Sequence, residues 1–397
     1  LDLTATLSRA NATQVHRYLP NTIPTPVRQY VRDAVQAGQS NQVSLRLRGN
    51  LKDMPFDNPK LGEFRVVAQV AHGQYAYVPS APTWPALTEM TGELVFDRSA
   101  MHFKGRTQLA GAPDVVWQKV EAHIPNLSDA VVDVHGEARG PLAQVLGIVA
   151  KSPLNDLTGK VLSHGQASGD AAYKLSLNLP INQLEKSQVQ GGVTFADSTI
   201  QLIPGTPVLK RTRGNLQFSE HGFELKSLQA QALGGDAVID GGLSFAADEG
   251  KSPLQLNIRG DLTAEGLRQA VELGFVSKLA QRATGKSTYV ATVGLRRGQP
   301  ELLIQSDLKG MSLALPSPLN KPATTALPLR IETRLTKESM QAKARVLHDQ
   351  IQVTLGRVVS VMYVRDLNGP SARVLRGGIA VGQSVVDAVP IDRKSVV

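Results

Sequence analysis

The chain has 397 residues, of which 42% are hydrophobic and 19% are charged. These fractions are close to the average of globular proteins and exclude a chain that is disordered throughout. Cysteine is absent, which excludes zinc–thiolate sites, iron–sulfur clusters, thiol catalysis and disulfide bonds. The net charge of +9 is only mildly basic for this length, and no run of about 18 apolar residues predicts a transmembrane helix.

The two ends of the sequence predict an internal piece of a longer protein. The sequence begins with Leu1 instead of Met and has no basic, hydrophobic leader, so we expect the natural N-terminus to be missing. Residues 392–397 read DRKSVV and resemble the translation of a sequencing adapter, so we interpret them as an artefact.

The first predicted element is a helix over residues 24–38, which opens with two prolines and ends near a glycine. Residues 43–49 then alternate strictly between aliphatic and polar side chains, which predicts a strand with one apolar and one polar face. Shorter alternating pieces follow at residues 94–96 and 101–103. The apolar residues of the helix recur three and four positions apart, at Val27, Tyr30, Val31, Ala34 and Val35.

A second, shorter helix is predicted over residues 141–150, and an alternating strand follows at residues 173–179. Another alternating strand at residues 254–258 leads into the third predicted helix, over residues 263–283. Thr263 is a favourable N-cap for that helix. None of the three helices has a basic face large enough to predict binding to a membrane surface.

Alternation resumes at residues 289–293 and 327–331, so the sequence predicts a mainly β protein with a long, curled, largely antiparallel sheet. A twisted open sheet rarely exceeds about ten strands without curling or splitting, and the strand candidates exceed that number. A sandwich would cover its own apolar faces, whereas a curled sheet leaves an elongated apolar groove. A recurring strand end of aliphatic residue and proline, at residues 78–79, 203–204 and 315–316, favours the groove. Glycine pairs predict turns at residues 191–192, 234–235, 241–242 and 377–378.

No motif predicts catalysis, a metal site or a cofactor. Residues 285–288 read GKST, as at the end of a phosphate-binding loop, but Ala280 stands where that motif requires its first glycine. The eight histidines lack the spacing of a helical zinc site, and there is no Gly-x-Ser-x-Gly elbow. We therefore predict a protein that is not an enzyme, and a hydrolase on a β scaffold is the weakest alternative.

The basic and aromatic residues leave two interpretations open. The clusters at residues 210–213 and 296–297 have no interleaved aromatics, so we predict no binding to nucleic acid, and attraction to anionic lipid headgroups is a minor alternative. Tyr75, Tyr77 and Trp84 gather around one strand end and loop. We favour a loop tethered by buried rings, and an aromatic rim on a groove is the alternative.

Four segments of the sequence resemble the YhdP branch of the AsmA-like, or repeating β-groove, envelope proteins of Gram-negative bacteria. They are YLPNTIPTPVRQYVRDAVQAGQ at 18–39, LRGNLKDMPFDNPKLGEFRVVAQVAHGQYAYVP at 47–79, GELVFDRSAMHFKG at 92–105 and GGVTFADSTIQLIPGTPVLKRTRGNLQF at 191–218. The resemblance covers most of residues 1–390, and the family has no agreed catalytic motif to carry over.

The resemblance implies a periplasmic β-groove behind an inner-membrane helix, in a protein that helps to move phospholipid towards the outer membrane. We expect the membrane helix and the C-terminal part of the family to be missing from this sequence. The expected partners are phospholipid acyl chains, the inner membrane and proteins on the outer-membrane side. An envelope scaffold that binds extended polypeptide on the same architecture is the main alternative. We expect a first groove module at residues 1–260 and a second, truncated module at residues 261–391.

The candidate lining of the groove is the apolar side of the alternating strands. About five strand residues span about 16 Å, close to the roughly 15 Å hydrocarbon depth of one lipid leaflet. The candidates are Val43, Leu45, Leu47, Phe64, Val66, Val70, Tyr173, Leu175, Leu177, Leu254, Leu256 and Ile258.

Overall fold

The computed structural model describes residues 1–382 apart from residues 22, 82, 158–160, 202–205, 246–251, 342–345 and 370–371. The presumed adapter residues 392–397 and the predicted strand end at 203–204 therefore lie outside the described residues. The described chain is mainly β and antiparallel, as predicted, with twenty-two strands in the described ranges. No helix in those ranges is long and apolar enough to cross a membrane.

The chain groups into two compact units, which are described separately. Unit 1 comprises residues 1–156, 168–195 and 217–220, and unit 2 comprises residues 157–167, 196–216 and 221–397. These units differ from the modules predicted at residues 1–260 and 261–391, and a modular repeat stays a prediction.

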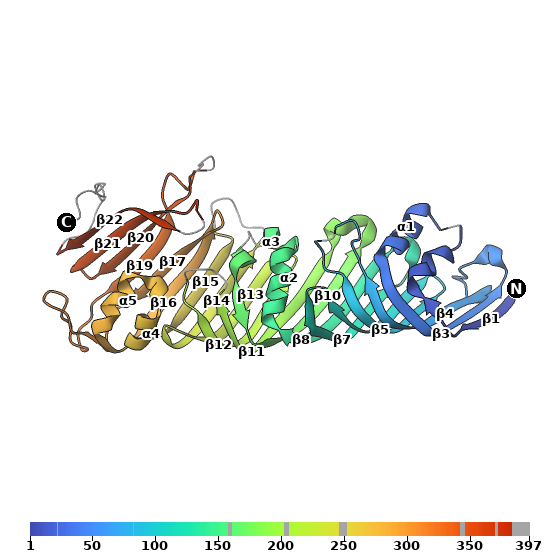
Figure 1. Ribbon diagram of the computed structural model, residues 1–397, viewed down its shortest axis with the longest axis horizontal. Coiled ribbons are helices and arrows are strands. Elements are labelled where there is room, and N and C mark those ends of the chain that lie inside the picture. The colour runs from blue at the N-terminus through green and yellow to red at the C-terminus, as the bar shows by residue number, and fades with distance from the viewer. Residues whose placement is uncertain are drawn as a thin grey trace. The chain divides into compact units, whose positions relative to one another are not determined.

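Unit 1 is built on an antiparallel succession of strands in which β1 pairs with β3 and each later strand pairs with the next, up to β8 (Figure 1). Strand β8 then pairs with β10, and β10 with β11, whereas the short β2 pairs with β3. The strands are β1 (Asp2–Leu7), β2 (Ala10–Asn11), β3 (Val35–Gly49), β4 (Gly62–Tyr75), β5 (Leu87–Asp97), β6 (Ala100–Leu109), β7 (Ala112–Ile124), β8 (Val131–Pro141) and β10 (Asp170–Pro180). Three further strands carry residues of both units: β9 (Gln166–Ser168), β11 (Gln188–Gln201) and β12 (Leu209–Ser219).

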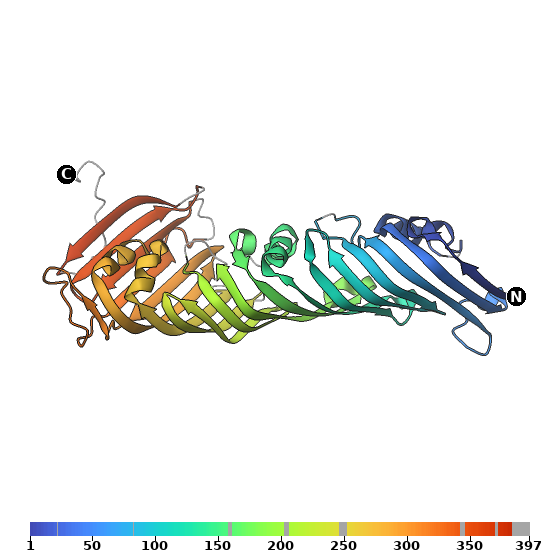
Figure 2. The same ribbon diagram turned by 60° about the horizontal axis from the view of Figure 1, so that its bottom comes forward.

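Unit 2 is also built from antiparallel strands, and each strand from β13 to β17 pairs with the next strand in the sequence (Figure 2). Strand β17 pairs with β19, the later strands pair in order, and the short β18 pairs with β16. The strands are β13 (Gly222–Ala232), β14 (Gly234–Ser244), β15 (Leu254–Thr263), β16 (Ala283–Arg296), β17 (Gln299–Ser306), β18 (Met311–Leu313), β19 (Leu329–Leu335), β20 (His348–Leu355), β21 (Val359–Asp366) and β22 (Arg373–Val381).

The first two α-helices occur where the sequence predicts them, and the first is shorter than predicted. Helix α1 (Thr25–Ala34) ends four residues before Gly38, because Val35 adopts an extended conformation and opens β3 opposite Tyr75. Helix α2 covers Leu142–Lys151, and α3 covers Leu154–Leu157. Short 3₁₀ helices are η1 (Ala12–Arg17), η2 (Leu51–Asp53), η3 (Leu127–Asp129), η4 (Val161–His164) and η5 (Ile181–Lys186).

The single helix predicted over residues 263–283 is wrong. The structure has α4 (Ala264–Gln269) and α5 (Phe275–Leu279), followed by the 3₁₀ helix η7 (Ala280–Arg282). Between them, η6 (Val271–Leu273) ends at Gly274, which has a φ of 56°. This left-handed conformation is accessible to glycine and interrupts a right-handed helix.

β-Bulges interrupt five successive strand pairs of unit 1, from β3–β4 to β7–β8. A bulge adds a residue to one strand, bends that strand and increases its twist. At two of them the backbone is left-handed, with φ of 51° at His72 and 50° at Glu89. The sheet of unit 1 is therefore bent along a line that crosses its strands.

Three of the four glycine pairs predicted as turns lie inside strands, so that prediction is wrong for residues 191–192, 241–242 and 377–378. In the first of these pairs, a Cβ on Gly191 would overlap the ring of Phe218. The strand glycine Gly136, which is outside these pairs, is constrained in the same way, because a Cβ on it would lie 2.8 Å from the ring of Trp117 on the adjacent strand. A side chain at this position would displace the aromatic ring that covers the backbone.

The loop after β4 is tethered to helix α1 by tyrosines. The hydroxyl groups of Tyr30 and Tyr75 lie 2.7 Å apart, and the Tyr30 hydroxyl donates to the carbonyl oxygen of Tyr77 at 3.1 Å. Burial raises the pKa of the Tyr75 hydroxyl, and Tyr30 raises it further. The Tyr77 and Trp84 rings pack with their centroids 6.3 Å apart. These contacts favour the tethered loop over an aromatic rim.

Replacement of Gly136 with Ala is expected to lower the free energy of unfolding by about 1–3 kcal/mol, because the new methyl group overlaps the Trp117 ring. The matched control is Gly147→Ala in α2, where a Cβ meets nothing within 4 Å. That control is expected to be neutral or to stabilise by up to about 1 kcal/mol. Urea denaturation of both variants checks this, and equal effects would contradict it.

Replacement of Tyr30 with Phe removes both hydroxyl contacts to the β4 end, at a cost of about 1 kcal/mol. We expect faster amide hydrogen exchange in residues 76–81, with little change in the strands. Tyr18→Phe is the control, because Tyr18 is 83% exposed. Unchanged exchange in residues 76–81 of the Tyr30→Phe protein would show that the hydroxyl tether is unimportant.

Candidate functional site

An apolar face extends across the sheet of unit 1. In an antiparallel pair, directly opposed residues project to the same side of the sheet. Leu45 is opposite Val66, Val66 is opposite Phe96, Phe96 is opposite Met101, and Met101 is opposite Ile124. One apolar row therefore crosses the five strands from β3 to β7.

A second row on the same face is longer and reaches the end of unit 1. It begins at Leu7 of β1 and ends at Val189 of β11. We call these two rows, with their alternating neighbours, the unit 1 apolar face. The members of the second row are Leu7, Val43, Ala68, Leu94, Phe103, Ala122, Val134, Leu177 and Val189.

The nine predicted lining residues of unit 1 all lie on this face. Leu47 is opposite Phe64, next to the first row, and Val70 continues the alternation of β4. Leu175 follows the alternation of β10 beside Leu177. The nine are Val43, Leu45, Leu47, Phe64, Val66, Val70, Tyr173, Leu175 and Leu177.

The opposite face of the unit 1 sheet is polar and carries cross-strand ion pairs. Lys104 lies 2.8 Å from Glu121. Glu137 lies between Lys119 at 3.3 Å and Lys174 at 3.4 Å, and hydrogen bonds from both lysines lower the pKa of its carboxyl group. The two faces of the sheet therefore differ in chemistry as strict alternation predicts.

Helix α2 covers only one end of the unit 1 apolar face. Tyr173 is 5% exposed there and packs in a cluster with Ala138, Trp117 and the α2 residues Leu142 and Val145. Away from this cluster most residues of the two rows are half-buried, Phe103 is buried, and Leu7 is 46% exposed. Most of the face outside the packed cluster, to which Tyr173 belongs, is therefore only half-buried.

In unit 2 the corresponding face is covered. The predicted lining residue Leu254 is 3% exposed in a cluster with Leu243 and Val293, whereas Leu256 and Ile258 are half-buried. Cross-strand pairing places Ile258 in an apolar row with Ile239, Ala291, Ile304, Ile331, Val353 and Val361.

Residues 264–282, which contain α4 and α5, pack on this row, and we call them the plug. Leu267, Leu273 and Val276 of the plug are at most 8% exposed and share one core cluster with Ile304 and Val353. The three side chains contribute about 1.5–3 kcal/mol each by burial, which holds the plug on the sheet. Phe275 and Leu279 pack against the same cluster and are partly buried, whereas the buried Ala264, Ala270 and Ala280 add little apolar area.

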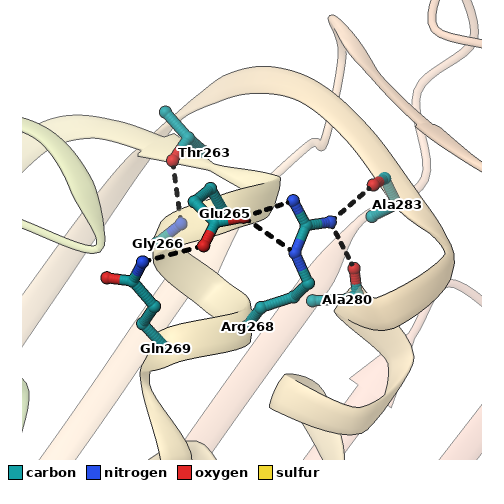
Figure 3. A network of polar contacts seen from close by, with 7 residues as sticks. All are labelled: Thr263, Glu265, Gly266, Arg268, Gln269, Ala280 and Ala283. Atoms are coloured by element: carbon teal, nitrogen blue, oxygen red, sulfur yellow. Dashed lines mark hydrogen bonds and ion pairs between the residues drawn. The ribbon is translucent and has the colours of Figure 1, made fainter.

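Arg268 braces the plug internally (Figure 3). Its guanidinium group donates to Glu265 at 2.6 Å and to the carbonyl oxygens of Ala280 at 3.2 Å and Ala283 at 3.1 Å. Hydrogen bonds from Arg268 and Gln269 lower the pKa of the Glu265 carboxyl group. The brace therefore joins the first helix of the plug to its last turn and to the start of β16.

The structure supplies no catalytic constellation in the described residues. His135 Nδ1 lies 3.1 Å from the Ser176 hydroxyl, but both lie on the polar face, and the neighbouring Glu121 is paired with Lys104. A pocket of about 530 Å³ on that face includes Lys104, Lys119 and Glu121, and its lining contains neither histidine nor serine. No group of three or more His, Asp or Glu in the described ranges is arranged to hold a metal ion.

The residues that resembled a phosphate-binding loop lie in a strand. Arg282 ends the plug, Ala283 begins β16, and Gly285 pairs with Met311 of β18. Of the basic clusters, Arg296 pairs with Glu301 at 3.3 Å and Arg297 donates to the carbonyl oxygen of Ser339 at 2.6 Å. These arginines therefore serve local structure.

Sequence reasoning missed part of the unit 1 apolar face and all of the brace. Phe96, Met101 and Phe103 were visible as alternating residues, but only the register shows that they share a face with Leu45. Trp117 lies beyond a bulge in β7, so simple alternation does not predict its side. No local pattern indicates that Arg268 reaches two carbonyl groups twelve and fifteen residues away.

The sequence of the chain is similar to that of a known protein. The chain is 26% identical over 339 residues to a protein of Escherichia coli (strain K12) named "Intermembrane phospholipid transporter YhdP". The match covers 84% of this chain and 26% of that relative, so the chain spans about a quarter of its length. No solved structure matches. A family model described as YhdP protein matches residues 1–396, and the chain therefore belongs to the YhdP family.

Proposed function

We propose that this chain is a segment of a lipid conduit and that the unit 1 apolar face holds phospholipid acyl chains. The observation that carries the proposal is the continuity of that face: cross-strand pairs extend it from β1 to β11, and most of it is half-buried. A relative is named an intermembrane phospholipid transporter, which supports the same assignment.

The physical need for such a face is large. An acyl chain of about sixteen carbons loses about 13 kcal/mol of hydrophobic stabilisation when it leaves a bilayer for water. An apolar protein face that contacts the acyl chain throughout its path recovers part of this lost hydrophobic stabilisation. The polar face with its ion pairs keeps the other side of the sheet compatible with water.

Among the predicted lining residues, we propose that those of β3, β4 and the far end of β10 contact lipid. Tyr173 and Leu254 are buried in packed clusters, so we propose a structural role for them. The candidates for contact are Val43, Leu45, Leu47, Phe64, Val66, Val70, Leu175 and Leu177.

We further propose a periplasmic location, with attachment to the inner membrane through a segment outside this sequence and with partners on the outer-membrane side. Membership of the YhdP family supports this placement. In this role the chain has no catalytic step, because it shields apolar chains from water without changing bonds.

The test uses Trp117 as a reporter on the unit 1 apolar face. The chain has two tryptophans, so a Trp84→Phe background leaves Trp117 alone. Phospholipid with brominated acyl chains is expected to quench its fluorescence in a saturable manner. In that background Leu175→Asp is expected to weaken quenching at least about tenfold, because a carboxylate then faces the acyl chain.

Gln190→Asp is the matched control, because Gln190 is exposed on the polar face of β11, opposite Ser176. It adds the same charge beside the same strand pair and is expected to leave quenching unchanged. Equal loss in both variants, or no quenching of the folded parent protein, would contradict the proposal. The second result would favour the scaffold that binds extended polypeptide.

A further inference from the structure

The plug is the long connection between β15 and β16, and these two strands pair with each other. Strands β15 and β16 are in register from Gln255 opposite Gly294 to Thr263 opposite Lys286. The plug leaves after Thr263 and returns at Ala283, so its movement away from the sheet breaks no pair of this ladder. The connection is far longer than the two to five residues that join most antiparallel neighbours.

The plug packs on an apolar face that is formed, like the unit 1 apolar face, by rows of opposed apolar residues. In unit 2 the row residues Ile304, Val353 and Val361 are at most 3% exposed beneath the plug. On the edge strand β22, Ile379 is opposite Val361 and is 61% exposed. The sheet of unit 2 therefore presents an apolar face that the chain covers with its own residues.

The attachment of the plug has two separable parts. The first part is apolar burial, in which Leu267, Leu273 and Val276 are buried on the row. Phe275 and Leu279 pack against the same cluster and are partly buried. The second part is the Arg268 brace, whose groups remain accessible to water: the Arg268 side chain is 30% exposed and that of Glu265 is 61% exposed. The exposed Val271, at 77%, marks the break between the two helices.

We propose that the face beneath the plug is a second acyl-chain site, which a linear acyl chain occupies when the plug swings away. Arg268 holds the plug closed through its hydrogen bond to the carbonyl oxygen of Ala283 at the start of β16. This inference rests on the proposed function, because it assigns the same ligand class to a second face. A long acyl chain is apolar throughout its length, so it competes with the five large apolar side chains of the plug for the same row. The position of the plug then decides whether lipid reaches this face of unit 2.

The experiment uses palmitate with a photoactivatable group near its methyl end, incubated with the complete 397-residue chain, and maps crosslinked peptides by mass spectrometry. We expect labelling of the unit 1 apolar face in all proteins. In unit 2, labelling of peptides that contain Ile304 or Val353 is expected to rise at least threefold in Arg268→Ala. Arg268→Lys is expected to give an intermediate value, because lysine keeps the charge and loses the fork that reaches two carbonyl groups.

Arg259→Ala is the matched control, because Arg259 on β15 forms a 3.3 Å ion pair with Asp240 on the adjacent strand β14 of unit 2. It is expected to label like the parent protein. Labelling of unit 1 with none of unit 2 in any variant would overturn the second site and leave the proposed function standing. An equal rise in Arg259→Ala and Arg268→Ala would overturn the role of Arg268, and no labelling of either unit would overturn both proposals.

A second measurement needs no change at Arg268. Because the chain has no cysteine, Val271→Cys and Val290→Cys place two spin labels at positions that are 77% and 49% exposed, one on the plug and one on β16. Palmitate is expected to add a population with a longer distance between the labels. A distance distribution that palmitate leaves unchanged would show that the plug is a fixed part of the core.

Discussion

The antiparallel register is the constraint on which this protein depends. Each strand alternates apolar and polar side chains, and the cross-strand pairing brings the apolar sets of successive strands to one side. In unit 1 this aligns Leu45, Val66, Phe96 and Met101 without a polar interruption. A shift of one residue in any pair would send that strand's apolar set to the polar face. The register thus converts many short, ordinary strands into one continuous apolar surface, while the ion pairs of Lys104 and Glu137 mark the other side.

The two units differ in the elements that cover the apolar side of the sheet. Helix α2 covers one end of the face in unit 1 and leaves most of the rest half-buried. In unit 2 the plug completes a core in which Ile304 and Val353 are almost fully buried. The same strand pattern therefore leaves a half-buried apolar face in one unit and forms the wall of a folded core in the other. The difference arises in the connections between strands, not in the strands themselves.

The predictions that rest on local sequence patterns were mostly confirmed, whereas those that depend on contacts with other segments were mostly wrong. The mainly β antiparallel fold and the positions of α1 and α2 were predictable, because alternation and helical spacing are local patterns. The helix predicted over residues 263–283 failed at Gly274, where an apolar stripe continues although the backbone turns left-handed. The glycine pair at residues 191–192 was misread as a turn, because the ring of Phe218, which a Cβ on Gly191 would overlap, belongs to another strand.

The sequence by itself determined which side chains alternate, where most strands lie and which twelve residues were candidates for an apolar lining. The tertiary structure alone decided that nine of them share one face of unit 1, because register depends on how neighbouring strands align with one another. It also decided that Tyr173 and Leu254 are packed while Leu175 and Leu45 are half-buried, because exposure depends on which connection folds over the sheet. The Arg268 brace belongs to the same category, since only the folded chain brings the carbonyl groups of Ala280 and Ala283 to Arg268.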